Sequence, residues 1–155
     1  MASVRAQIFA AVKAKLETVK ADLSFQSVLV NPREEVGEDQ MNALLFWHGG
    51  DLEPDGLTGH VDRRQLEFTV GWMVRETSAT PAEDLLDAAF VAVSDALMNP
   101  ADIQLSGLAI AITQGALSDP MIGRARSGAL ILGGQACDFA VEYLAREGDA
   151  STVSP

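Results

Sequence analysis

The two histidines of the chain stand among carboxylates in one glycine-containing stretch, residues 47–62 (WHGGDLEPDGLTGHVD). The stretch holds His48, Asp51, Glu53, Asp55, His60 and Asp62. Imidazole and carboxylate groups carry protons and bind metal ions. The stretch is therefore a candidate metal site, proton relay or acidic binding loop. If a hairpin brought His48 and His60 together, a metal-dependent hydrolase would be the function to test.

The spacing of the histidines favours a simpler interpretation. Zinc ligands usually come in close pairs, such as two histidines one helical turn apart or Cys-x-x-Cys, on a rigid frame. His48 and His60 instead lie at opposite ends of a segment broken by glycines and a proline. We expect a solvated loop between two strands, which binds no metal and no cofactor.

Other catalytic patterns are absent from the sequence. Cys137 falls on the apolar face of an expected strand, where a free cysteine is usually a small core residue. No G-x-S-x-G elbow, Walker loop or dinucleotide fingerprint occurs. The adjacent carboxylates Glu34 and Glu35 suit an exposed loop, and Glu83 and Asp84 suit a helix start. The sequence thus predicts a protein that is not an enzyme.

The composition indicates one soluble domain with an acidic surface. The chain has 155 residues, 48 % of them hydrophobic and 21 % charged, with a formal net charge of −11. Its cations are scattered, and Arg124 with Arg126 is the nearest approach to a basic patch, which argues against specific nucleic-acid binding. No apolar run is long enough to cross a bilayer, so we expect no membrane association. With one cysteine no internal disulfide can form, and we expect a cytosolic protein.

Two helices are expected. Apolar residues three and four apart predict the first, from about Ser3 to Asp22, with Ser3 as N-cap and Lys13 placed to pair with Glu17. The second lies within residues 77–100. Its start is predicted from Thr80 as N-cap, Pro81 at the first helical position and Glu83 completing a capping box, and its end from Asn99-Pro100.

Five strands are expected around these helices. The clearest is in residues 64–77, where Leu66, Phe68, Val70, Trp72 and Val74 alternate with more polar residues. The others are predicted within residues 24–32, 41–48, 103–115 and 129–147, the last interrupted by a bulge or turn at Gly133-Gly134. Residues 33–40 and 116–128 are expected to be loops.

The resulting order is α-β-β-β-α-β-β: an α+β domain over residues 1–146, with two helices on a mostly antiparallel sheet of about five strands. The tail, residues 147–155, has little to bury and is expected to be disordered. Surplus strand faces and edges, together with two acidic loops (33–40 and 47–62) projecting from one end of the sheet, favour a structural protein that joins an assembly.

Four segments define the organisation of the chain: the opening helix with Arg5, Ile8, Val12 and Leu16, the alternating strand LEFTVGWMV, the helix TPAEDLLDAAFVAVSDAL and the final strand DFAVEYLARE. Together they resemble the phage tail terminator proteins, the minor tail protein U-like family. The resemblance covers roughly residues 3–146 and concerns organisation rather than an invariant motif.

The resemblance implies a structural protein of phage or prophage origin that forms a ring, expected to be hexameric, on the end of the tail tube. Such a ring stops tube polymerisation and offers a head-joining surface, so its partners are the tail tube protein and a head or neck connector protein. It is assembled in the host cytoplasm and resides in the virion tail. DNA passes through its lumen, where acidic walls would repel the genome. A related neck or tail-completion protein is the alternative.

The residues expected to make contacts in such an assembly lie mainly in the two acidic loops. These interaction candidates are His48, Asp51, Glu53, Asp55, His60, Glu34, Glu35, Arg124 and Arg126.

Overall fold

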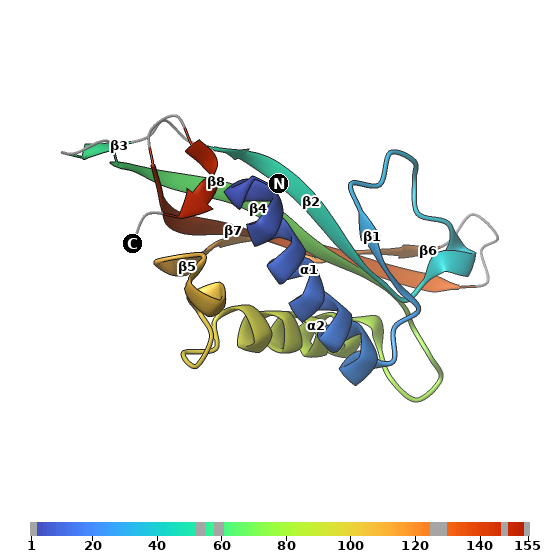
Figure 1. Ribbon diagram of the computed structural model, residues 1–155. Coiled ribbons are helices and arrows are strands. Elements are labelled where there is room, and N and C mark those ends of the chain that lie inside the picture. Colours follow the sequence, from blue (N-terminus) through green and yellow to red (C-terminus); the bar gives the residue numbers. More distant parts are fainter. Residues whose placement is uncertain (1–2, 52–54, 58–60, 125–129, 147–148, 154–155) are drawn as a thin grey trace.

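The computed structural model of the chain describes residues 3–51, 55–57, 61–124, 130–146 and 149–153. Two helices lie on one side of a strongly twisted sheet (Figure 1). The elements, in chain order, are α1 (Val4–Leu23), β1 (Ser27–Val30), the 3₁₀ turn η1 (Glu38–Gln40), β2 (Ala43–Asp51), β3 (Asp55–Leu57), β4 (Val61–Arg75), α2 (Ala82–Leu97), the 3₁₀ turn η2 (Leu105–Gly107), β5 (Ala111–Leu117), β6 (Met121–Arg124), β7 (Ile131–Arg146) and β8 (Asp149–Val153).

The main strands are ordered β1-β2-β4-β7-β5, with β3 paired to β4 and both β6 and β8 paired to β7. All neighbours are antiparallel except β1 and β2, which are parallel, so the sheet is mixed. The predicted α+β class and the order α-β-β-β-α-β-β are confirmed for the main elements. The three additional strands are short and lie beside these.

The alternation predicted for residues 64–77 sets the two faces of the sheet. Leu66, Phe68, Val70, Trp72 and Val74 are all buried on the side of the helices. Strand pairing brings Leu44 and Phe46 of β2 and Cys137, Phe139 and Val141 of β7 to the same face. These side chains and the buried residues of both helices form one hydrophobic core. Burial of Cys137 agrees with its predicted core position.

Helix α1 begins as predicted, because the Ser3 side chain accepts a hydrogen bond from the Ala6 amide at 3.1 Å. The predicted start of α2 is wrong by one residue. Pro81 is extended and takes the N-cap position, and Glu76 accepts the hydrogen bond of the Ala82 amide at 3.1 Å. Thr80 lies in the preceding turn, where its amide donates to the Thr77 hydroxyl.

The stretch 47–62 is less of a loop than predicted. β2 continues through His48 to Asp51, with an irregular register between those two residues, and β4 begins at Val61. β3 lies between them and pairs with β4. The two acidic segments also do not project from one end: residues 33–40 and β3 lie at opposite ends of the sheet (Figure 1). This separation follows because β2 runs nine residues away from the first segment before β3 begins.

The second half of the chain differs from prediction at three places. Residues 103–115 form a strand only from Ala111, because Leu105, Ser106 and Gly107 have positive φ angles that a strand cannot contain. The expected loop 116–128 contains β6. Gly133 and Gly134 interrupt nothing, since β7 runs unbroken across them.

Glycine is needed at position 133 for packing. A Cβ there would lie 3.1 Å from the Leu86 Cδ1 atom, so the missing side chain lets α2 approach the strand closely. In the tail that the sequence predicts to be disordered, residues 149–153 form β8 against the end of β7.

Candidate functional site

The structure describes only some residues of the candidate histidine site. His48 is a strand residue near the end of β2, and Asp51 ends that strand. Asp55 belongs to β3, and Glu53, His60 and Arg126 lie outside the described residues. Within the described part of the chain, no group of three or more His, Cys, Asp or Glu side chains could hold a metal ion. Because His60 lies outside the described residues, the alternative in which it pairs with His48 is not tested.

His48 is instead part of an aromatic cluster on the helix side of β2. Its ring stacks on Phe9 of α1, with centroids 3.9 Å apart and planes 9° from parallel, and meets the edge of Phe46 at 4.8 Å. The amide of His48 donates to the Asn31 side-chain oxygen at 2.8 Å. Partial burial, and secondarily the positive charge of Arg5, lower the pKa of His48. The neutral ring is thus the favoured form.

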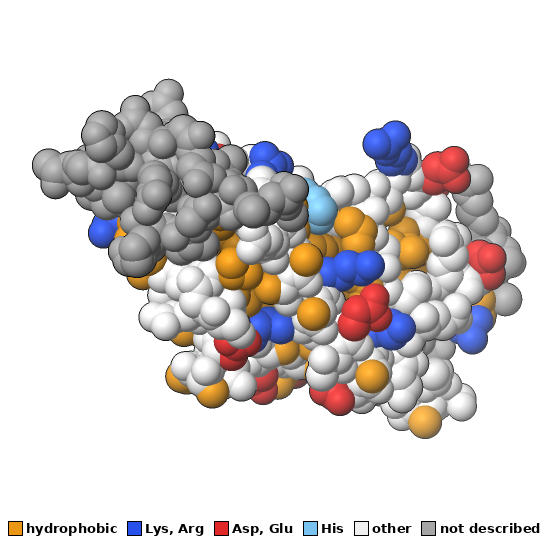
Figure 2. All heavy atoms as spheres, viewed as in Figure 1, with side chains coloured by type: hydrophobic (Ala, Val, Ile, Leu, Met, Phe, Trp, Pro, Cys, Tyr) orange, Lys and Arg blue, Asp and Glu red, His pale blue; other side chains and the backbone are white. Residues whose placement is uncertain are grey.

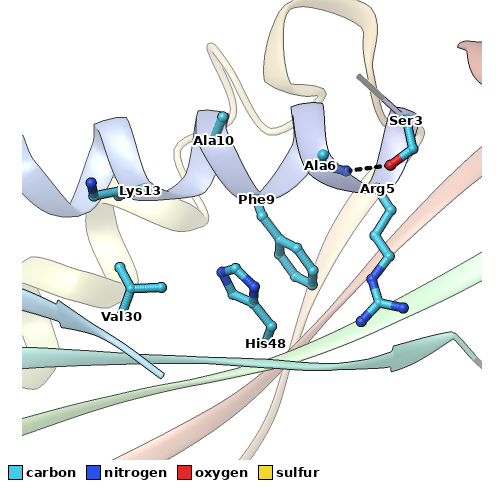
Figure 3. A pocket seen from close by; sticks show the side chains of 8 residues that line it. All are labelled: Ser3, Arg5, Ala6, Phe9, Ala10, Lys13, Val30 and His48. Atoms are coloured by element: carbon cyan, nitrogen blue, oxygen red, sulfur yellow. Dashed lines mark hydrogen bonds between the residues drawn. The ribbon is translucent and has the colours of Figure 1, made fainter. Parts of the chain in front are cut away.

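A groove of about 460 Å³ opens above this cluster, between the N-terminal half of α1 and the sheet. Phe9 and His48 lie at its base, Val30 of β1 stands on one side, and Arg5 and Lys13 mark its two ends along the helix (Figure 3). In the space-filling view, a histidine surface lies at the edge of hydrophobic side chains on this face (Figure 2). The groove is therefore apolar at its base and cationic at its rim.

Arg5 is held in place at one end of the groove. Its guanidinium donates to the Gly49 carbonyl oxygen at 2.7 Å and lies 5.4 Å from the centre of the Phe9 ring. Gly49 is itself constrained, because a Cβ there would lie 2.5 Å from the Glu67 carbonyl oxygen. The groove's lining, Ser3, Arg5, Ala6, Phe9, Ala10, Lys13, Val30 and His48, contains no carboxylate among the described residues. In a chain with a net charge of −11, this groove favours an anionic partner.

The other interaction candidates lie away from this groove. Glu34 and Glu35 are exposed between β1 and η1. Asp51 accepts a hydrogen bond from the buried Tyr143 hydroxyl at 3.1 Å, and burial with the nearby Asp51 charge raises the pKa of Tyr143 to about 12. Asp51 thus has a structural partner. Arg124 ends β6, an exposed strand that the sequence did not predict.

A second groove lies on the face of the sheet that the helices do not cover. It has a volume of about 550 Å³, and its apolar lining comes from Leu45, Trp47, Met73, Met121, Ile122 and Leu132, with Glu35 and Arg124 beside them. Met121 and Ile122 of β6 are 79 % and 41 % exposed. Trp47 lies across Gly71, where a Cβ would come within 2.8 Å of the indole ring. Large apolar side chains are therefore exposed beside an edge strand.

His48 could be identified as a candidate from the sequence. Its partners Phe9 and Arg5, about forty positions earlier in the chain, could not. No local pattern connects an α1 side chain with one particular strand residue. The sequence did contain one signal, the pair Met121-Ile122, two large apolar residues in a segment that is predicted to be a loop.

Comparison with protein-family models finds none that matches this chain, and a search among curated proteins finds no significant match. Within the described residues, neither helix combines the length and apolar character that a membrane span requires.

Proposed function

We propose that the protein is a structural subunit that assembles into a ring and closes the end of a phage tail tube, as a tail terminator. The observation that carries this proposal is the uncovered apolar groove next to β6. A solitary subunit gains nothing from placing Met121 and Ile122 in water beside Trp47 and Met73, whereas a subunit contact would bury them.

The edges of the sheet support assembly by the same reasoning. β1 is one edge of the main sheet, and β5 with β6 lies at the other, beyond β7. Unpaired strand edges pair readily with another chain. Because the two edges differ, contact between them would be head to tail, and head-to-tail contacts of suitable rotation close into rings. A ring of subunits each carrying a formal charge of −11 would also suit a channel through which DNA passes without adhering.

The first test is self-association of the full chain. Sedimentation velocity over a range of concentrations is expected to give a closed oligomer, visible as a ring by negative-stain electron microscopy. The variant Met121→Asp/Ile122→Asp should weaken this association at least about tenfold, because it would place charges in an apolar contact. Ser78→Asp/Ala79→Asp is the matched control: it adds the same charge at two exposed turn residues and should assemble normally. Equal assembly of both variants would contradict the role given to β6.

The second test addresses the position in the virion. With the tail tube protein of the same phage, the ring should bind tube ends and stop elongation, and deletion of the gene should give overlong tubes without heads. Normal tubes that fail to join heads would indicate the neck or tail-completion alternative. The metal-dependent hydrolase alternative predicts bound metal that is lost on His48→Ala or His60→Ala, which elemental analysis of the purified protein measures.

A further inference from the structure

Helix α2 presents an acidic stripe to solvent. Asp87, Val91 and Asp95 are all exposed, Val91 to 48 %, and successive members are four residues apart. The helix contains neither lysine nor arginine, and no described residue forms an ion pair with either aspartate. The stripe is thus an apolar side chain between two carboxylates whose charges have no partner within the described part of the chain.

The groove on α1 is lined by residues of opposite charge that have the same four-residue spacing. Arg5, Phe9 and Lys13 are also four residues apart, so an aromatic floor lies between two exposed cations (Figure 3). The sequence predicts that Lys13 pairs with Glu17, but Glu17 pairs with Lys20 at 3.0 Å. Lys13 has no ion pair among the described residues. The Arg5 guanidinium donates one hydrogen bond to the Gly49 carbonyl oxygen and has further N–H groups that can donate to a partner.

The two triplets, Arg5–Phe9–Lys13 on α1 and Asp87–Val91–Asp95 on α2, have the same length and opposite charges. Eight helical residues span about 12 Å, so the outer cations of α1 and the outer carboxylates of α2 have the same separation along their helices. A helix laid against the groove would put Val91 over Phe9 and His48 and each aspartate near one cation. Ala6 and Ala10, which also line the groove, leave room for a close approach. This pattern of anchors is that of a helix bound in a groove.

The two triplets of one subunit do not meet each other. α1 packs against α2, and Lys15 joins the two helices: its ammonium donates to the Ala96 carbonyl oxygen of α2 at 3.3 Å and lies 3.2 Å from a carboxylate oxygen of Asp102, which follows α2. The two aspartates with Val91 on α2 and the two cations on α1 are exposed beside this contact, and the exposed His48 ring stacks on the buried Phe9 between those cations. We therefore propose that the Asp87–Val91–Asp95 stripe of a second copy occupies the α1 groove. This inference rests on the proposed self-assembly and names the helical part of the subunit contact.

Because the two surfaces differ, the contact can be tested with a pair of charge-reversed variants. In one, Arg5→Glu/Lys13→Glu makes the groove acidic; in the other, Asp87→Lys/Asp95→Lys makes the stripe basic. Each variant alone should self-associate at least about tenfold more weakly than the unmodified chain, because like charges would face each other. Mixed in equal amounts they should co-assemble to near the original affinity, since every contact then pairs opposite charges.

Sedimentation velocity of the full-length proteins measures both effects, with circular dichroism as the test of folding. Asp22→Lys/Asp119→Lys is the control for the second variant, because it changes the net charge equally at two other exposed carboxylates. If Arg5→Glu/Lys13→Glu fails to fold, Lys13→Glu alone replaces it.

The possible outcomes separate this inference from the proposed function. Weak association of each variant with recovery in the mixture supports the inference. Assembly of both variants as strong as the original, or no recovery in the mixture, overturns it while the proposed ring stands. An unmodified chain that remains monomeric at every concentration overturns both.

Discussion

The two faces of the sheet show different solutions to the same problem of covering apolar residues. On the helix side, Phe68 lies between Phe46 and Phe139 at ring-centre distances of 5.6 and 5.4 Å, and nearly all the large side chains of β4 are sealed from water. On the other side, Trp47 and Met73 line a groove to which neither helix contributes a described residue, and Met121 at the edge is 79 % exposed. The first face is covered within the chain, whereas the second leaves apolar side chains in contact with water, where the proposed assembly would cover them. Folding and assembly should therefore respond to different mutations.

The largest effect is expected from removing a ring on the helix side. Phe68→Ala should reduce the free energy of unfolding by about 3–5 kcal/mol, because the cavity cannot be filled by its packed neighbours. Met121→Ala should reduce it by less than about 0.5 kcal/mol, because that side chain is exposed in the subunit. Urea denaturation at a concentration where the chain is monomeric measures both. If the two substitutions reduced the free energy of unfolding by similar amounts, the two faces would not differ in their contribution to folding.

A smaller effect is expected where two strands touch directly. Gly49→Ala would place a methyl group 2.5 Å from the Glu67 carbonyl oxygen, a clash that should cost about 1–3 kcal/mol of unfolding free energy. Gly50→Ala is the matched control, because nothing lies within 4 Å of the position its Cβ would take. Thermal unfolding of the two variants should therefore differ clearly, and equal midpoints would show that β2 does not hold this register.

Tyr143→Phe tests a polar contact at the margin of the core. It removes the hydroxyl that donates to Asp51 and should cost about 1 kcal/mol, because the ring still fills its site. In the unmodified protein, spectrophotometric titration should place the phenol pKa near 12, since burial and the Asp51 carboxylate both disfavour the phenolate. The chain has one tyrosine, so the signal is unambiguous. A pKa near 10 would mean that this contact does not form in solution.

The smallest effect concerns pH and the groove. Because burial and Arg5 lower the pKa of His48 in the folded state, the unfolded chain binds the proton more readily. The contribution of His48 to stability is therefore complete above its unfolded pKa of about 6.5 and is lost as the pH falls through its lower folded value. His48→Gln should reduce the difference in unfolding free energy between pH 7.5 and pH 5.5. If the substitution leaves this pH dependence unchanged, folding does not lower the pKa of His48.

The difference between the two faces also explains which parts of the fold could be predicted from the sequence. The alternation in β4 and the periodic faces of both helices are local consequences of burial, and they predicted the core and the order of the main elements. β6 escaped prediction because all four of its residues are exposed and carry no alternation. The sequence predicts a bulge or turn at Gly133-Gly134, whereas Gly133 in fact lets Leu86 of a distant helix approach the strand.

The groove on α1 could be predicted only in part for a related reason. His48 was conspicuous as a rare residue type, but what it does depends on Phe9 and Arg5, which only the folded chain brings to it. The matching triplet on α2 was likewise not predicted, because nothing in the sequence distinguishes Asp87, Val91 and Asp95 from other residues on an exposed helix surface. A hydrophobic pattern predicts which side chains are buried when the chain folds. It does not predict which of the exposed side chains could contact another molecule.

The position of β7 has a consequence for synthesis of the chain. This strand pairs with β4, β5, β6 and β8, yet it begins only at Ile131, so most of the sheet cannot form until residues 131–146 have left the ribosome. Until then β4 has one open edge, and β5 and β6 have no neighbour to pair with. The apolar groove beside β6 is built partly from β7 as well, through Leu132 and its neighbours. A nascent chain without β7 thus lacks this surface, so the proposed contact between subunits requires that β7 has already joined the sheet.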